Sequence, residues 1–160
     1  MKKIEIICVG KLREKYLIEA YSEYNKRLKS YAKLETIEIE DERILAKASI
    51  KEEEKAKNIE GQKILAKLKD DAFVIAMTLD GQMQSSEQFA KYMDEIYINR
   101  VNHIAFIIGG SVGLSEDIIK RANLKLSFSK MTFPHQLFRI ILIEQIYRAC
   151  KISANETYHK

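Results

Sequence analysis

The sequence predicts an α/β fold, a mostly parallel sheet flanked by helices, and two observations carry that prediction. Residues 72–79 and 104–108 are nearly continuous apolar runs, which are typical of central parallel strands buried on both faces. Segments with helical signals lie between the expected strands, and this alternation indicates a parallel sheet. The length of 160 residues suits one domain, residues 1–160, and the single proline favours long uninterrupted elements.

The first half of the chain predicts two strand-and-helix units. Residues 4–10 form an apolar strand that ends at a turn glycine. Residues 12–28 place an apolar or aromatic side chain at every fourth position, which predicts an amphipathic helix. Residues 34–39 alternate Ile and Glu at their end and predict a strand with one wet face, followed by an irregular surface loop over 41–48. A capping box then opens a helix over residues 49–68.

The second half predicts the remaining elements. After the strand at 72–79, a second capping box opens a helix over residues 85–97. The strand at 104–108 leads into a glycine turn, and Ser115 caps a short helix with acidic residues in its first turn. Residues 126–128 form a last short strand, and a proline, which the first turn of a helix tolerates, opens the final helix over residues 134–152.

Charge is unevenly distributed along the chain. Lys and Arg total 27 against 23 Asp and Glu, so the net charge is +4. Residues 1–100 hold 19 basic and 19 acidic side chains, whereas residues 101–160 hold 8 basic and 4 acidic ones. This is weaker than the footprint of a dedicated nucleic-acid-binding protein. Two interpretations stay open: an ordinary surface, or a modest basic patch that faces a polyanion.

Cysteine, histidine and hydropathy patterns exclude further classes. Cys8 and Cys150 lie in apolar segments outside any CxxC motif, so we expect buried thiols and no disulfide framework. The three histidines have no metal-ligand spacing, so we expect no metal. No apolar run approaches the roughly 18 residues of a membrane helix, and no signal-peptide cleavage site follows the start. We therefore expect a cytoplasmic protein that binds no membrane.

Ligands of open α/β sheets bind at the carboxyl ends of the strands, where the loops after residues 79, 108 and 128 lie. The turn at 109–114 (GGSVGL) is neither a dinucleotide fingerprint nor a P-loop, so a tight turn and a ligand site remain alternatives. The loop at 127–136 mixes hydroxyls with large apolar side chains. Either the protein's own core or an amphiphilic ligand, such as a cofactor with an adenine ring and a ribose, must cover them.

The final helix is apolar around most of its circumference near its start, which indicates burial from several sides. A second subunit is a candidate cover. Glu144 lies four residues before Arg148 and is its obvious helical partner. Arg139 has no acid so placed, so we expect it to be solvated or directed at an anionic ligand.

Four motifs occur together and in order. They are the run Leu126-Ser-Phe-Ser-Lys-Met-Thr-Phe-Pro-His-Gln136, the turn Gly109-Gly-Ser-Val-Gly-Leu114, the opening Val9-Gly-Lys-Leu12 and the terminal Tyr158-His-Lys160. Together they closely resemble the RlmH family, the minimal SPOUT-class methyltransferases also called ribosomal RNA large subunit methyltransferase H. The resemblance spans the whole chain, and the run that ends in Pro-His-Gln is its most specific part.

The resemblance implies a fold and a cofactor. SPOUT enzymes have a parallel α/β fold whose C-terminal part, here about residues 103–160, is threaded into a trefoil knot, and they are homodimers. S-adenosylmethionine binds in the knot. The implied cofactor contacts are Met77, Gly109, Phe128, Ser129, Lys130, Met131, Thr132 and Phe133.

The resemblance also implies a reaction, N3-methylation of a pseudouridine in 23S ribosomal RNA on the assembled ribosome. The sulfonium methyl is already electrophilic, so the protein's task is alignment and stabilisation of charge on the carbonyl oxygens that flank N3. The catalytic candidates are His135, Arg139, Tyr158 and His159. The substrate-binding candidates are Arg139, Tyr158, His159 and Lys160.

Three departures from the family pattern concern details. Residues 153–157 replace a run that often contains Arg, Val112 stands where a polar residue is more frequent, and Met77 replaces the usual Leu. The altered tail keeps one alternative open, a non-catalytic ribosome-associated factor with the same fold. A nucleotide-binding module of the Rossmann or flavodoxin type is disfavoured, because the loop after the first strand has only one glycine, Gly10.

Overall fold

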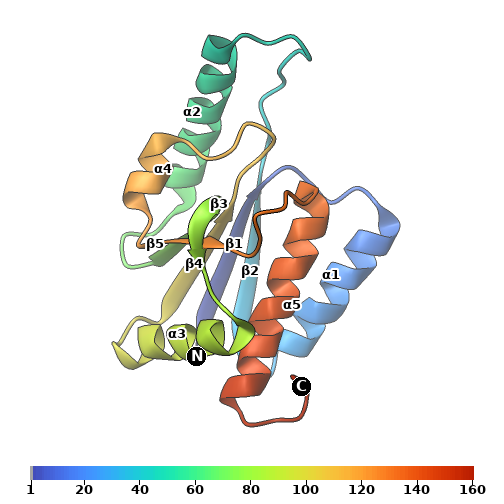
Figure 1. The fold of residues 1–160 in the computed structure, drawn as a ribbon, viewed down its shortest axis with the longest axis vertical. Coiled ribbons are helices and arrows are strands. Elements are labelled where there is room, and N and C mark those ends of the chain that lie inside the picture. The colour runs from blue at the N-terminus through green and yellow to red at the C-terminus, as the bar shows by residue number, and fades with distance from the viewer. Residues whose placement is uncertain (1) are drawn as a thin grey trace.

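The computed structural model describes residues 2–160 as a five-stranded parallel sheet with helices on both faces (Figure 1). The strands are β1 (Lys3–Val9), β2 (Lys33–Ile39), β3 (Phe73–Met83), β4 (His103–Ile108) and β5 (Leu124–Ser127). The helices are α1 (Lys15–Leu28), α2 (Ile50–Lys67), α3 (Ser86–Ile98), α4 (Glu116–Arg121) and α5 (His135–Ser153). The strand order is β2-β1-β4-β3-β5 and every pairing is parallel, so the predicted fold class is confirmed.

The sheet separates two hydrophobic cores, because successive side chains of a strand point to opposite faces. On one face, α1, α3 and α5 cover a core that includes Ile6 and Phe106. On the other face, α2 and α4 cover a smaller core that includes Ile7 and Ile107. Every residue of β4 is buried, as its continuous apolar run predicts.

Three helices, α2, α3 and α4, begin at serine caps. The Ser85 hydroxyl accepts a hydrogen bond from the Gln88 backbone, and the Gln88 side chain accepts one from the Ser85 backbone, which completes the predicted capping box of α3. Ser49 and Ser115 likewise accept hydrogen bonds from the first turns of α2 and α4. The predicted starts of these three helices are therefore confirmed.

Some boundaries differ from the prediction. Helix α1 begins at Lys15 instead of residue 12, because the chain stays extended as far as its N-cap. Strand β3 continues to Met83, beyond residue 79, with an irregularity against β5 between Met77 and Gln82. Strand β5 ends at Ser127, so the loop after it already includes Phe128.

The apolar helix α5 packs against α1 and α3 on the sheet, so this chain itself covers most of its surface. Leu137, in its first turn, remains 41% exposed. Both cysteines are free thiols whose pKa burial raises to about 11. Within residues 2–160, no helix is long and apolar enough to cross a membrane. The trefoil knot over residues 103–160 stays a prediction.

Candidate functional site

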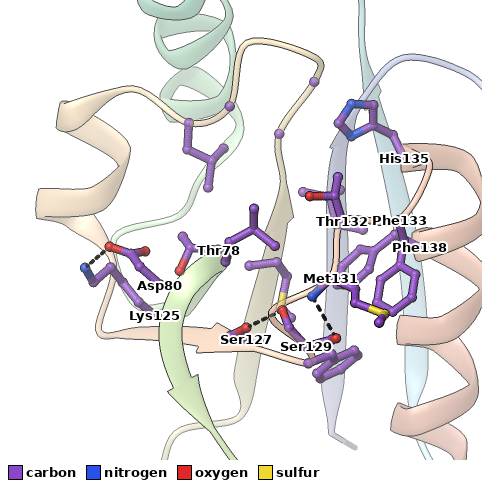
Figure 2. Close-up of a pocket in the computed structure, with 18 of the residues that line it drawn as sticks. Thr78, Asp80, Lys125, Ser127, Ser129, Met131, Thr132, Phe133, His135 and Phe138 are labelled. Carbon is purple, nitrogen blue, oxygen red and sulfur yellow. Dashed lines mark hydrogen bonds and ion pairs between the residues drawn. The ribbon is translucent and has the colours of Figure 1, made fainter.

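A cavity of about 520 Å³ opens at the carboxyl ends of β3, β4 and β5 (Figure 2). Residues 77–80 of β3 and the loops that follow β4 and β5 form its walls, as expected for a ligand site in an open α/β sheet. Seven of the eight residues predicted to contact a cofactor line this one cavity: Met77, Gly109, Phe128, Ser129, Met131, Thr132 and Phe133. The eighth, Lys130, is exposed and does not line it.

Aromatic side chains form one wall of the cavity. Phe138 of α5 lies 5.5 Å from Phe128 and 6.3 Å from Phe133 between ring centroids, and the latter pair is stacked. Phe128 and Phe133 are half-buried by these contacts, whereas Met131 is 74% exposed. The protein's own core therefore covers part of the apolar loop and leaves its outer part to another surface or ligand.

A charged pair lies on the opposite side of the cavity (Figure 2). The Lys125 ammonium is 3.3 Å from an Asp80 carboxylate oxygen. The Thr78 hydroxyl, and after it Lys125, lowers the pKa of Asp80, so this carboxylate is ionised at neutral pH. The sequence-based candidates include none of these three residues: Thr78 and Asp80 lie within β3, and Lys125 lies near the start of β5.

Two hydrogen bonds between residues two positions apart shape the loop between β5 and α5. The Ser127 hydroxyl donates to the Ser129 carbonyl at 3.0 Å, and the Met131 backbone donates to the Ser129 hydroxyl at 2.9 Å. These bonds curl the loop so that Thr132 and Phe133 line the cavity next to His135. His135 is exposed at the rim, and it is the only one of the four catalytic candidates that lines the cavity.

The glycine turn is closed by a hydrogen bond from the Gly113 backbone to the Gly110 carbonyl. Gly113 has a φ of +82°, which favours glycine, whereas a Cβ on Gly109 would lie 3.0 Å from both the Gly113 backbone and the Leu114 side chain. A side chain at Gly109 therefore points at the turn itself. A side chain there would deform the turn that forms the cavity wall.

A buried carboxylate lies beneath this turn. Glu60 of α2 is 3% exposed, and its Oε2 accepts a hydrogen bond from the Glu42 backbone. Its Oε1 has no partner within residues 2–160, and a Cβ on Gly110 would lie 3.5 Å from it. Burial, the largest influence, raises the pKa of Glu60.

The expectation that Arg139 is solvated or faces an anionic ligand is wrong. Arg139 is 3% exposed, and its guanidinium donates to Glu38 Oε2 at 2.6 Å and to the Gly10 carbonyl at 3.1 Å. Local sequence patterns could not predict this pair, because Glu38 lies on β2, 101 positions away. Arg139 thus links α5 to the ends of β1 and β2, and its predicted roles in catalysis and substrate binding remain untested.

The C-terminal tail folds back onto α5 and α3. The Tyr158 hydroxyl donates to Glu144 at 3.0 Å, and Arg148 pairs with the same carboxylate, as predicted. His159 accepts from Arg148 through Nδ1, so its Nε2 carries the proton and donates to Glu87 at 2.6 Å. Burial raises the pKa of Tyr158 to about 12.

This tail does not line the cavity of its own chain. Neither Tyr158, His159 nor the exposed Lys160 is among the lining residues. Glu144, to which the tail is bonded, lies nine positions after His135 on α5, about 13 Å along the helix axis. Figure 1 shows the C-terminus near the opposite end of α5 from the cavity loops.

The basic excess of residues 101–160 is largely neutralised within the chain. Six of its eight cations are engaged with acids or, for one arginine, with main-chain carbonyls: Lys120, Arg121, Lys125, Arg139, Arg148 and Lys151. Among the described residues, only Lys130 and Lys160 of this third lack such a partner. The sequence count therefore does not translate into a patch of free cations.

The parallel α/β fold, with a cavity formed by a glycine turn and an apolar loop at the ends of the strands, is typical of α/β proteins that bind a small ligand. Residues 1–159 match the family model described as "Predicted SPOUT methyltransferase", and the chain belongs to this methyltransferase family.

Curated relatives are similar to this chain over nearly its full length. The chain is 54% identical to "Ribosomal RNA large subunit methyltransferase H" of Clostridium acetobutylicum, over 98% of this chain and 99% of that protein. Proteins of the same name from Clostridium beijerinckii and Clostridium novyi are 56% and 55% identical, with the same coverage. The resemblance stated from the motifs is thereby confirmed.

Proposed function

We propose that the protein is an S-adenosylmethionine-dependent methyltransferase that methylates N3 of a pseudouridine in 23S ribosomal RNA on the assembled ribosome. The observation that carries the proposal is the single cavity that gathers seven of the eight residues implied by the family resemblance. The names of the relatives, which are 54–56% identical, support a ribosomal RNA of the large subunit as the substrate.

The cavity fits the chemistry of the cofactor. Its volume of about 520 Å³ lies in the range of small-molecule sites, and apolar lining with a few polar groups is typical of such sites. Phe128 and Phe133 suit the flat adenine ring, and the hydroxyls of Ser129 and Thr132 suit a ribose. When bound, S-adenosylmethionine supplies a methyl group on a positively charged sulfur.

The protein's own task is to align the base and to manage one proton. N3 of pseudouridine is an imide nitrogen whose proton must leave before or during attack. His135, exposed at the cavity rim, is the group we favour to receive that proton or to hydrogen-bond a flanking carbonyl oxygen. Tyr158 and His159 remain candidates whose contribution a deletion of the tail tests.

We further propose that the active form is a homodimer. Large apolar side chains are exposed on the segments around the cavity: Leu79, Met83, Met131 and Leu137. A partner subunit that packed on these segments would bury these side chains. Leu137, Ile141 and Gln145 follow one another at four-residue spacing on one face of α5, and the latter two line a second cavity of about 220 Å³. Sedimentation velocity should give twice the mass of 18.6 kDa, and a monomer would contradict the proposal.

The proposal also places the protein in the cytoplasm with the ribosomes. Ribosomal surfaces and the partner subunit would contribute to substrate recognition. The catalytic step itself needs no metal, because the methyl group is already electrophilic.

Transfer of a tritiated methyl group tests the proposal. Ribosomes from a strain that lacks the native enzyme should incorporate the label, whereas free 23S RNA should not. A Gly109→Val variant, with a deformed cavity wall, serves as the inactive control. Ribosome binding without incorporation would instead establish the non-catalytic factor and overturn the proposal.

A further inference from the structure

Two exposed cations beside the cavity have no role in the fold. Lys11 and Arg13 lie on the segment that joins β1 to α1. Within residues 2–160, neither side chain forms an ion pair or a hydrogen bond, in contrast to most basic side chains of the C-terminal third. Their charge is therefore available to a ligand.

The backbone of this segment is held close to the cavity rim. The Arg13 backbone donates to Gln136 at 2.9 Å, and Gln136 follows His135, which lines the cavity. Arg139 of α5 donates to the Gly10 carbonyl, so α5 contacts the segment at two points. In Figure 1 the segment passes the start of α5 on its way to α1. The two cations are thus presented at a defined place next to the cavity.

The segment from Gly10 to Glu14 itself carries a net positive charge. The nearest acid on β2, Glu38, is neutralised by Arg139. Lys15 lies 3.9 Å from Glu19, and Glu14 is the one acid within the segment. Within the segment, two free cations stand against one free carboxylate, which leaves a net charge of +1.

Lys11 and Arg13 lie outside the cavity, so they suit a ligand that extends beyond it. An RNA that inserts one base into the cavity lays its backbone, with one phosphate for each nucleotide, across the rim. We propose that Lys11 and Arg13 form a phosphate-binding edge that holds the RNA backbone next to the target nucleotide. This inference rests on the proposed function.

The test compares two double variants that remove the same charge. Lys11→Gln with Arg13→Gln removes the proposed contacts, and Lys26→Gln with Lys29→Gln removes two exposed cations at the other end of α1. Because none of these side chains has a salt-bridge partner within residues 2–160, both variants should melt close to the wild type. Methyl transfer to ribosomes is measured over a range of salt concentrations, and cofactor affinity is measured by calorimetry.

We expect the first double variant to raise the KM for ribosomes about tenfold or more, with kcat and cofactor affinity within about twofold of the wild type. The dependence of log KM on log salt should become shallower by about 1.5 for two lost phosphate contacts. The control variant should match the wild type. An unchanged KM and an unchanged salt slope in the first variant would overturn the inference.

Failure of the proposed function has a different signature. If the wild type transfers no methyl group to ribosomes, the methyltransferase proposal fails. Cosedimentation with ribosomes then tests the phosphate-binding edge by itself, because loss of binding in the first double variant alone would still support it. Equal binding by all three proteins would overturn it.

Discussion

Replacement of Arg139 by Met tests the internal pair that ties α5 to the ends of β1 and β2. Methionine keeps much of the apolar volume of the arginine stem but removes both hydrogen bonds, to Glu38 and to the Gly10 carbonyl. The carbonyl would then lose a buried donor, and Glu38 would lose its counter-charge. We therefore expect a loss of stability and a less fixed segment between Gly10 and Lys15.

The magnitude follows from the two bonds and from their exposure. A hydrogen bond to a charged group contributes about 1.5–3 kcal/mol. The Glu38 side chain is 37% exposed, so water replaces part of its interaction, and methionine also removes a guanidinium nitrogen, Nε, that has no partner within residues 2–160. We expect a net loss of about 2 kcal/mol in the free energy of unfolding. For a chain of this length that is a decrease of about 4–8 °C in Tm.

Thermal unfolding followed by circular dichroism measures this effect. Lys47→Met, at an exposed site in the loop before α2, should leave Tm within about 1 °C and serves as the control. A double-mutant cycle with Glu38→Gln should give a coupling energy of about 1–2 kcal/mol. An Arg139→Met variant as stable as the wild type, or a cycle without coupling, would refute the structural role of this pair.

Three further predictions concern the cavity, the tail and the buried carboxylate. Gly109→Val should abolish S-adenosylmethionine binding in calorimetry, because a side chain there meets Gly113 and Leu114 and deforms the turn; ordinary affinity would refute this assignment. Deletion of residues 158–160 should abolish methylation but keep cofactor affinity within a few-fold, and unchanged turnover would show that the tail is idle. Because burial raises the pKa of Glu60, its protonated form is favoured in the fold, and stability is lost as pH rises through the raised value. The Tm of Glu60→Gln should therefore equal that of the wild type at about pH 4 and exceed it at about pH 8. A variant whose Tm falls below that of the wild type as pH rises would contradict this reasoning.

Local signals in the sequence were sufficient for most elements. The apolar runs predicted β3 and β4, which are neighbours within the sheet, and Ser85 with Gln88 predicted the start of α3. Such signals depend on residues a few positions apart. The strand order and the bulge of β3 against β5 depend on pairing between distant segments, which periodicity does not encode.

The candidate site was predicted from a different kind of signal. The family resemblance, rather than residue spacing, predicted that Met77, the glycine turn and the loop after β5 contact one ligand. In the structure these segments line one cavity. The sequence predicted poorly which charged side chains are free to bind a ligand. The sequence shows which residues carry charge but not which charges are paired, so Arg139 was expected to be free, and Lys11 and Arg13 were not identified as free cations.

The most direct measurement identifies the product of the reaction. Ribosomes from a strain that lacks the native enzyme are incubated with the protein and with S-adenosylmethionine that carries a trideuterated methyl group, and the 23S RNA is then digested to nucleosides. We expect mass spectrometry to show one new nucleoside, N3-(trideuteromethyl)pseudouridine. The label on another nucleoside, or no labelled nucleoside despite ribosome binding, would contradict the proposed function.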